Sequence, residues 1–441
     1  MDWLVLAHGV GNAEDLPIPR DLAIAGAVGA LVVSFTVLAL AWRTPRYAAA
    51  HGRPVPAIGR VADSAALAWT LRLVGVALVG FGVYAALLGE DVLINPVFRM
   101  FYVLLWVGIV PASLLFGHAY RALSPVRTIN LLVAKVAGTD PSEGVYRYPE
   151  RLGTWPAALG LFAFVWFELV YPSFNELGPV RLWFATYLAV MLLGGVLFGD
   201  RFFARADPFE VFSSLVARLS VWGRDDDGTL VVRSPLANLA RTPVLPGLLA
   251  VVAVLFGSTS YDSFRESPVW VSFQTGYDGA VPAPLLSTAA LLGFCLLAGL
   301  LFAAACAATG VREGTSRWAL GGLFAHSVVP IVVGYFVAHY LSLFVEDGQT
   351  LLIQMSDPLS NGSNLFGTAD WSVSYWLSLH PTLLANIKVL GVVLGHIAGA
   401  VAAHDRALEL LPRRHQLTGQ LPLLAVMVVF TGGGLLLLFA A

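Results

Sequence analysis

The sequence predicts an all-α membrane protein: a polytopic bundle of about ten transmembrane helices that forms one integral membrane domain over residues 1–441. Of its 441 residues, 57% are hydrophobic and only 12% are charged, whereas a soluble protein carries about 25% charged residues. The apolar residues form runs that can cross a hydrocarbon core roughly 30 Å thick. The formal net charge of −2 gives no reason to expect a nucleic-acid partner.

Ten apolar runs are the predicted spans. They cover residues 22–42, 73–89, 100–116, 155–172, 180–198, 244–260, 284–307, 318–345, 381–404 and 421–440, each to within a few residues. At a rise of 1.5 Å per residue most of them reach across the bilayer core, and the second, fourth and sixth are short. Residues 1–20 lack the basic start and the apolar centre of a cleavable signal peptide, so we expect the first run to stay in the mature protein.

The loops between these runs alternate in charge. Most of the 26 lysines and arginines lie in residues 43–72, 117–154, 199–243, 308–317 and 405–420. The other side of the predicted membrane carries only Arg20, Arg99, Arg181 and Arg265. By the positive-inside rule the basic loops are cytoplasmic, so both termini are expected outside a cell membrane.

Two of the predicted inner loops contain periodic segments. Residues 125–136 and 208–219 have the pattern of short amphipathic helices that lie on the inner surface. The turn that begins at Arg224 leads into residues 229–233, which have the pattern of a short strand.

The chain also contains an internal similarity. Phe116-Gly-His-Ala-Tyr, followed by Ser124-Pro125, matches Phe198-Gly-Asp-Arg-Phe, followed by Asp207-Pro208. Downstream, Tyr171-Pro-Ser-Phe-Asn-Glu matches Tyr261-Asp-Ser-Phe-Arg-Glu. Two matches in the same order predict a parallel repeat of helix hairpins, with units at about 100–178 and 180–268.

The segment 318–406 holds two apolar runs that carry histidines. Its two helices are expected to be antiparallel neighbours, with His326 and His396 each roughly 12 Å from the inner end. Pro330, one turn beyond His326, can kink the first helix. Two level imidazoles could ligate a metal such as zinc or iron with a third ligand from elsewhere, relay protons, or, as a weaker alternative, bind haem. They could equally bond to neighbouring helices and only fix the packing.

A second set of ionisable residues is predicted nearer the outer surface. Glu168 and Lys388 are the acid and the base placed well inside spans, and a pair between them would offset part of the cost of burying each. Such a pair could face a substrate or could only orient helices. The polar stretch 258–262 is expected to line the same region, with His339 near the outer rim.

Six stretches carry a resemblance to a known family. They are Phe116-Gly-His-Ala-Tyr-Arg-Ala-Leu-Ser-Pro, Ala206-Asp-Pro-Phe-Glu-Val, Gly257-Ser-Thr-Ser-Tyr-Asp-Ser-Phe, Ala325-His-Ser-Val-Val-Pro, Ala338-His-Tyr-Leu-Ser-Leu and Ala403-His-Asp-Arg-Ala-Leu. In these the chain resembles a family of actinobacterial integral-membrane proteins, several of which are called fenitrothion hydrolase. The resemblance implies phosphotriester hydrolysis, a reaction that metal-bound hydroxide commonly assists.

We therefore expect a membrane-embedded, metal-dependent hydrolase of lipophilic esters of the organophosphate type. In this hypothesis His326 and His396 hold a metal or activate water, His339 contributes a ligand or relays a proton, and Glu168 and Lys388 polarise the substrate. The partners are the lipid bilayer and a lipophilic small molecule. The alternative is a secondary transporter, or a membrane redox or assembly protein, that uses the same histidines with Glu168 and Lys388 as a proton path.

Overall fold

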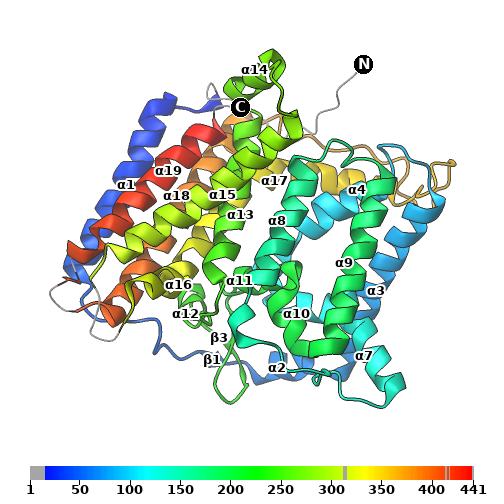
Figure 1. The fold of residues 1–441 in the computed structure, drawn as a ribbon, viewed down its shortest axis with the longest axis horizontal. Coiled ribbons are helices and arrows are strands. Elements are labelled where there is room, and N and C mark those ends of the chain that lie inside the picture. Colours follow the sequence, from blue (N-terminus) through cyan, green and yellow to red (C-terminus); the bar gives the residue numbers. More distant parts are fainter. Residues whose placement is uncertain (1–14, 311–314, 413–414, 417, 440–441) are drawn as a thin grey trace.

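The protein is described by a computed structural model that covers residues 15–310, 315–412, 415–416 and 418–439. It is an all-α protein in which the long helices run side by side and several short helices gather with a small sheet at one end (Figure 1). The long helices are α1 (Arg20–Ala41), α3 (Ala65–Leu88), α8 (Trp155–Leu169), α9 (Leu177–Phe198), α13 (Leu248–Arg265), α15 (Ala283–Ala307), α17 (Val329–Gln354), α18 (Pro381–Leu410) and α19 (Leu421–Leu438). The shorter elements are α2 (Pro56–Ala62), α4 (Pro96–Arg99), η2 (Met100–Val107), α5 (Ile109–Phe116), α6 (Tyr120–Leu123), α7 (Pro125–Ala137), η3 (Glu150–Leu152), α10 (Asp200–Ala206), α11 (Pro208–Ala217), α12 (Pro235–Ala240), α14 (Pro268–Gly276), η4 (Arg317–Ala319), α16 (Leu320–Phe324), η5 (Ala325–Val328) and η7 (Thr418–Gln420).

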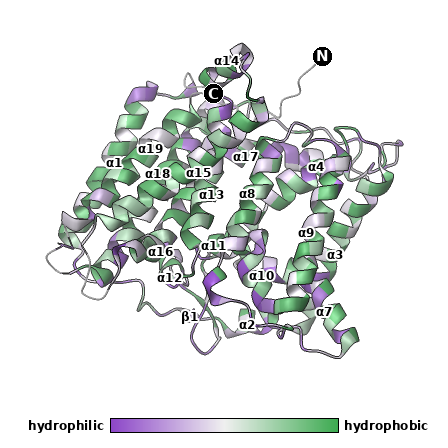
Figure 2. Ribbon diagram, viewed as in Figure 1, coloured by the Kyte–Doolittle hydropathy of each residue, from purple (hydrophilic) through white to green (hydrophobic). Residues whose placement is uncertain are grey.

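Each of the ten predicted runs contains a helix, and most of these helices suit a membrane. Within the described residues, seven spans are long and apolar enough to cross a bilayer. An eighth is formed if Pro96–Val107 and Ile109–Phe116, which meet at a 42° bend, count as one span. The predicted spans 155–172 and 244–260 fall short of this standard, since α8 has only 15 residues and α13 ends in a polar segment. Hydrophobic residues predominate along the long helices of the bundle (Figure 2), so the chain is a multi-pass membrane protein.

The centre of the bundle is α17. In its apolar segment 72% of the residues are buried, whereas the corresponding share is 11% for α3, whose apolar side chains face outward. Glycines bring α17 and α18 into close contact: a Cβ on Gly395 would lie 2.6 Å from the carbonyl oxygen of Pro330. Small residues at this position allow the two backbones to approach each other closely. On another side α17 packs against α13, which in turn packs against α8 and α15.

The helix that carries His326 is interrupted, as the position of Pro330 predicts. The turn Ala325–Val328 is a 3₁₀ helix between α16 and α17, and Pro330 lies in the first turn of α17. Proline is tolerated there because the first amide groups of a helix have no partner inside that helix. The interruption separates His326 from the regular helix that carries His339.

The predicted surface segments behave differently from each other. α7 leaves Val136 92% exposed, in line with a helix at a surface. In contrast, α11 is buried along almost its whole length and packs against α5 and α8, so the prediction of a surface position for residues 208–219 is wrong. Phe209 and Phe212 are fully buried, because neighbouring helices cover this segment. The predicted strand 229–233 is present as β3 (Leu230–Val232), which pairs with β1 (Arg53–Pro54) and β2 (Trp222–Arg224).

Polar side chains join the α5–α7 segment to the α9–α11 segment. Arg127 on α7 binds both oxygens of Glu210 on α11, at 2.5 and 2.7 Å, and also the Asp200 carboxylate, at 2.9 Å. Ser113 and Ser213 share a buried hydrogen bond of 2.8 Å. These contacts connect the two segments through buried charges, which are costly to leave without a partner.

The carboxyl group that precedes α11 makes the stability of the fold pH-dependent. Burial, together with the nearby Glu210 carboxylate, raises the pKa of Asp207 from 3.8 to about 7. The folded protein therefore holds this proton across a pH range in which the unfolded chain has lost it, so Asp207 lowers the stability as the pH rises from about 4 to about 7. We expect the Asp207→Asn variant to lose this contribution, since an amide oxygen can still accept the hydrogen bonds from Tyr187 and the amide of Phe209. Melting temperatures of detergent-solubilised protein at several pH values test this; equal pH slopes for variant and wild type would contradict it.

Candidate functional site

Asp262, near the end of α13, is the centre of a buried polar network. Its side chain is 1% exposed, and each of its oxygens has a partner. Oδ1 accepts a hydrogen bond from Arg265 Nε at 2.8 Å. Oδ2 lies 2.9 Å from His339 Nε2 and accepts a hydrogen bond of 2.8 Å from the Tyr340 hydroxyl. The carboxylate thus connects α13 to two adjacent residues of α17.

The network continues on the far side of the His339 ring. His339 Nδ1 lies 3.2 Å from Ser263 Oγ, and Ser263 Oγ lies 3.1 Å from the Tyr335 hydroxyl. The Tyr335 hydroxyl donates to the carbonyl oxygen of Gly434 on α19, at 3.2 Å. A row of titratable or hydroxyl groups therefore runs from Asp262 through His339 to a third helix, and every side chain in it is buried.

The buried hydroxyl groups just before Asp262 have a local role only. Thr259 and Ser260 each donate to the carbonyl oxygen four residues earlier, at 2.8 and 2.9 Å. Their hydrogen bonds are satisfied inside α13, so these two residues can be buried at little cost. By contrast, Asp262 and Ser263 bond to side chains of the neighbouring helix α17. Within the polar stretch, the candidate site therefore consists of these last two residues.

Glu168 on α8 lies next to this network. It is 6% exposed, its Oε2 has no hydrogen-bond partner in the described part of the chain, and the charges that act on it are those of Asp262 and Arg265. Arg265 also donates to the carbonyl oxygen of Leu169 at 3.4 Å, which ties it to α8. The predicted acid is therefore part of a buried charge cluster.

Lys388 on α18 is the second ionisable residue that the sequence placed inside a span. It is 1% exposed, and the charges acting on it are those of Asp15 and Glu266. Glu266 is in turn influenced by Asp262 and Arg265. The structure therefore buries both predicted residues, and the charges of the α13 end reach each of them: Asp262 and Arg265 act on Glu168, and Glu266 acts on Lys388.

His326 and His396 have different surroundings. His326 lines a small cavity with Ala402, Asp405 and Arg406 of α18. His396 Nδ1 bonds to the carbonyl oxygen of Val392, at 2.8 Å, and its Nε2 has no hydrogen-bond partner among the residues that the structure describes.

No group of three or more His, Cys, Asp or Glu side chains suited to a metal ion occurs in the described part of the chain. His404, which the sequence also placed on this helix, bonds to Gln420 and to the carbonyl oxygen of Trp42, at 3.1 and 3.0 Å. These contacts fix the packing of α18 against its neighbours. The metal site that the sequence predicts at His326 and His396 stays a prediction without support from geometry.

The sequence reasoning named His339 but missed its carboxylate partner. The sequence placed Asp262 in the polar stretch 258–262 and His339 near the outer rim, but it did not pair the two residues. In the structure α13 continues to Arg265, and both Asp262 and His339 are buried. The sequence does contain an indication that the helix continues past residue 260: Asp262 and Ser263 continue the helical spacing of the apolar residues that precede them.

The chemistry that this arrangement allows is proton transfer. Histidine is the side chain whose proton exchange lies closest to neutral pH, and a carboxylate at one ring nitrogen with a hydroxyl at the other provides a path through the ring. The order carboxylate, imidazole, serine hydroxyl is also that of a nucleophilic serine site. Ser263 is only 2% exposed, so in this conformation a substrate does not reach its hydroxyl group.

No protein-family model, curated protein or solved structure matches the chain.

Proposed function

We propose that the chain is a proton-coupled secondary transporter of a small lipophilic solute, in which the Asp262–His339 pair takes up and releases the coupled proton. The observation that carries this proposal is the fully buried carboxylate–imidazole contact of 2.9 Å between α13 and α17. Ionisable groups inside a membrane bundle are costly to keep, and in transporters they form the usual proton relays.

The contacts of the pair explain how a proton could be linked to movement. Asp262, Ser263 and Arg265 belong to α13, whereas Tyr335, His339 and Tyr340 belong to α17. Protonation of Asp262 reduces its capacity to accept the hydrogen bonds of His339 and Tyr340, so it weakens the contact between these two helices. A change in protonation therefore favours a different packing of α13 against α17. A bound proton can shift the protein between two conformations only if it stabilises one of them more than the other, and this contact provides that difference.

The direct test uses purified protein in liposomes loaded with a pH-sensitive dye. We expect an imposed pH gradient to drive proton flux that exceeds the leak of protein-free liposomes, and a panel of small lipophilic solutes to include one that increases it. Proton flux that equals the protein-free leak with every solute of the panel would contradict the proposal.

A second candidate is the hydrolase that the sequence predicts, now centred on Ser263. The row Asp262, His339, Ser263 has the order and the contact distances of a serine site, with 2.9 Å and 3.2 Å between successive groups. In this case a fluorophosphonate probe should label the wild-type protein but not the Ser263→Ala variant, and lipophilic ester turnover should follow the labelling. Labelling that persists in the variant would exclude Ser263 as the nucleophile.

We further propose ten spans, with both termini outside the cell membrane, and a parallel repeat. The repeat is supported by local geometry: Gly117 and Gly199, at matching positions, both have a φ of 65°. The match also relates the neighbours across the two units. Ser113 bonds to Ser213, and their counterparts Gly195 and Asn130 are close, since a Cβ on Gly195 would lie 2.9 Å from Asn130 Oδ1. Such an exchange is typical of a pseudo-twofold axis.

The orientation is checked by labelling single cysteines in intact cells. Both native cysteines, Cys295 and Cys306, are buried and free, so replacing them with alanine provides a background for this experiment. We expect a membrane-impermeant maleimide to label Asp370→Cys, on the predicted outer side, and to label Glu143→Cys only after permeabilisation. The reverse pattern would show that the proposed orientation is wrong.

A further inference from the structure

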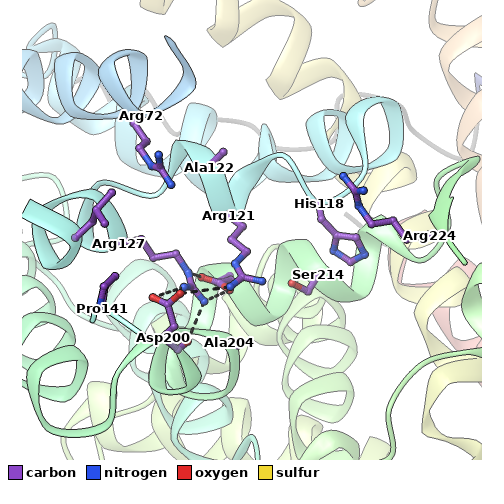
Figure 3. A pocket seen from close by; sticks show the side chains of 12 residues that line it. Arg72, His118, Arg121, Ala122, Arg127, Pro141, Asp200, Ala204, Ser214 and Arg224 are labelled. Carbon is purple, nitrogen blue, oxygen red and sulfur yellow. Dashed lines mark hydrogen bonds and ion pairs between the residues drawn. The ribbon is translucent and has the colours of Figure 1, made fainter. Parts of the chain in front are cut away.

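A large basic cavity lies at the end of the bundle where α6, α7 and α10 gather, remote from the Asp262 network. Its volume is about 620 Å³, within the usual range for small-molecule sites. Four arginines and His118 line it, against the two carboxylates of Asp200 and Glu210. Figure 3 shows these side chains arranged around a common space, with Arg121, Arg127 and Asp200 close together.

The arginines of this cavity differ in how well they are neutralised. Arg127 is 8% exposed and is held by both Glu210 and Asp200. Arg121 is 59% exposed and lies 3.5 Å from Asp200 Oδ2, on a carboxylate whose other oxygen already pairs with Arg127. Arg224 is paired with Asp63, which does not line the cavity. Arg72 has no carboxylate partner within the residues that the structure describes, so the cavity keeps an excess of positive charge.

The arginines approach the cavity from different directions, and this arrangement favours one kind of anionic ligand over another. Arg72 comes from α3, Arg121 from α6 and Arg224 from β2, so the guanidinium groups approach the cavity from different elements. A planar carboxylate presents two oxygens in one plane, whereas a phosphate group presents oxygens in several directions, each able to accept a guanidinium hydrogen bond. The cavity is also larger than an inorganic phosphate needs, which leaves room for the group that carries it.

We infer that this cavity is a binding site for a phosphate group, on either a water-soluble molecule or the head group of a phospholipid. It is independent of the proton path proposed above. The lipid source has a structural basis as well: Arg72 and Lys135 both stack on Trp69, at 5.2 and 4.9 Å from the ring centroid. Tryptophan and basic side chains together are typical of the membrane–water interface, where phospholipid head groups lie.

The test compares two phosphate sources on the full-length protein. In detergent, inorganic phosphate and pyrophosphate are titrated at constant ionic strength, with sodium acetate as the carboxylate control, while the melting temperature is followed. In the lipid arm, the protein in nanodiscs of phosphatidylcholine is compared with protein in nanodiscs that also contain phosphatidic acid. A ligand that binds only the folded state raises the melting temperature with its concentration.

The variants are chosen so that no buried acid loses its partner. Arg72→Gln removes a cation without a carboxylate partner, and Arg121→Gln removes an exposed one, so the double variant should keep the fold. The matched control is Arg151→Gln, an exposed arginine outside the cavity lining. We expect the double variant to weaken the apparent affinity for phosphate at least tenfold in the arm that shows binding, and the control to match the wild type.

The outcomes separate the two sources. A shift with soluble phosphates assigns the site to a soluble ligand, and a shift with phosphatidic acid alone assigns it to a lipid head group. The inference is overturned if neither arm shows a shift, if acetate reproduces it, or if the double variant responds like the wild type. Size-exclusion profiles and melting temperatures without ligand show whether each variant is folded before it is compared.

Discussion

Replacing Asp262 with asparagine is expected to reduce proton flux in liposomes to the level of protein-free controls. Asparagine has nearly the same shape, but it cannot exchange a proton with His339 at neutral pH. Its amide nitrogen is also a donor, so it cannot accept from both Arg265 and the Tyr340–His339 pair as the two carboxylate oxygens do. The measurement is the initial rate of dye response after a pH jump, normalised to the amount of protein that is reconstituted.

Two further variants separate a proton-transfer role from a structural one. Asp262→Glu keeps a titratable group and should retain part of the flux, while His339→Gln should lose it. The matched controls are Asp370→Asn and His380→Gln, which alter an exposed acid and an exposed histidine on the loop that follows α17. If Asp262→Asn is folded and transports protons at the wild-type rate, Asp262 is not part of the path.

The second large effect is expected at the contact between the α7 and α11 segments. Glu210 and Arg127 have side chains that are 4% and 8% exposed, and Arg127 bonds to both oxygens of Glu210. Changing Arg127 to methionine leaves the Glu210 carboxylate buried without its main partner. Breaking a buried pair in this way costs about 3–5 kcal/mol, so we expect a much lower melting temperature and poor recovery from detergent.

The double variant Arg127→Met/Glu210→Met provides the contrast. Replacing both charges with apolar groups of similar volume removes the uncompensated carboxylate, and such replacements are often neutral for stability. We therefore expect the double variant to melt close to the wild type and well above Arg127→Met. Equal melting temperatures for the wild type and Arg127→Met would show that the pair does not hold these segments together. The matched surface control is Arg201→Gln, whose partner Glu150 is 61% exposed.

The site predictions rest on two kinds of reasoning, which differ in what they can determine. His339, Glu168 and Lys388 were chosen because an ionisable group in an apolar run is costly, and all three are buried. His326 and His396 were paired because of their depth alone. Depth follows from the number of residues along a helix, but the direction in which a side chain points depends on how the helix is rotated against its neighbours. In the structure His326 lines a small cavity with Asp405 of α18, whereas His396 bonds to a carbonyl oxygen of its own helix.

The sequence by itself determined the helical class, the positions of the ten apolar segments and the alternation of basic loops, because these depend on composition and on periodicity along the chain. Only the tertiary structure decided that α11 is enclosed rather than lying on a surface, that Asp262 meets His339, and that four arginines surround one cavity. Each of these contacts joins residues that are more than seventy positions apart or on different helices. Such contacts depend on which face each helix turns toward its neighbours, and in a bundle of nearly uniform apolar helices the sequence pattern leaves that rotation open.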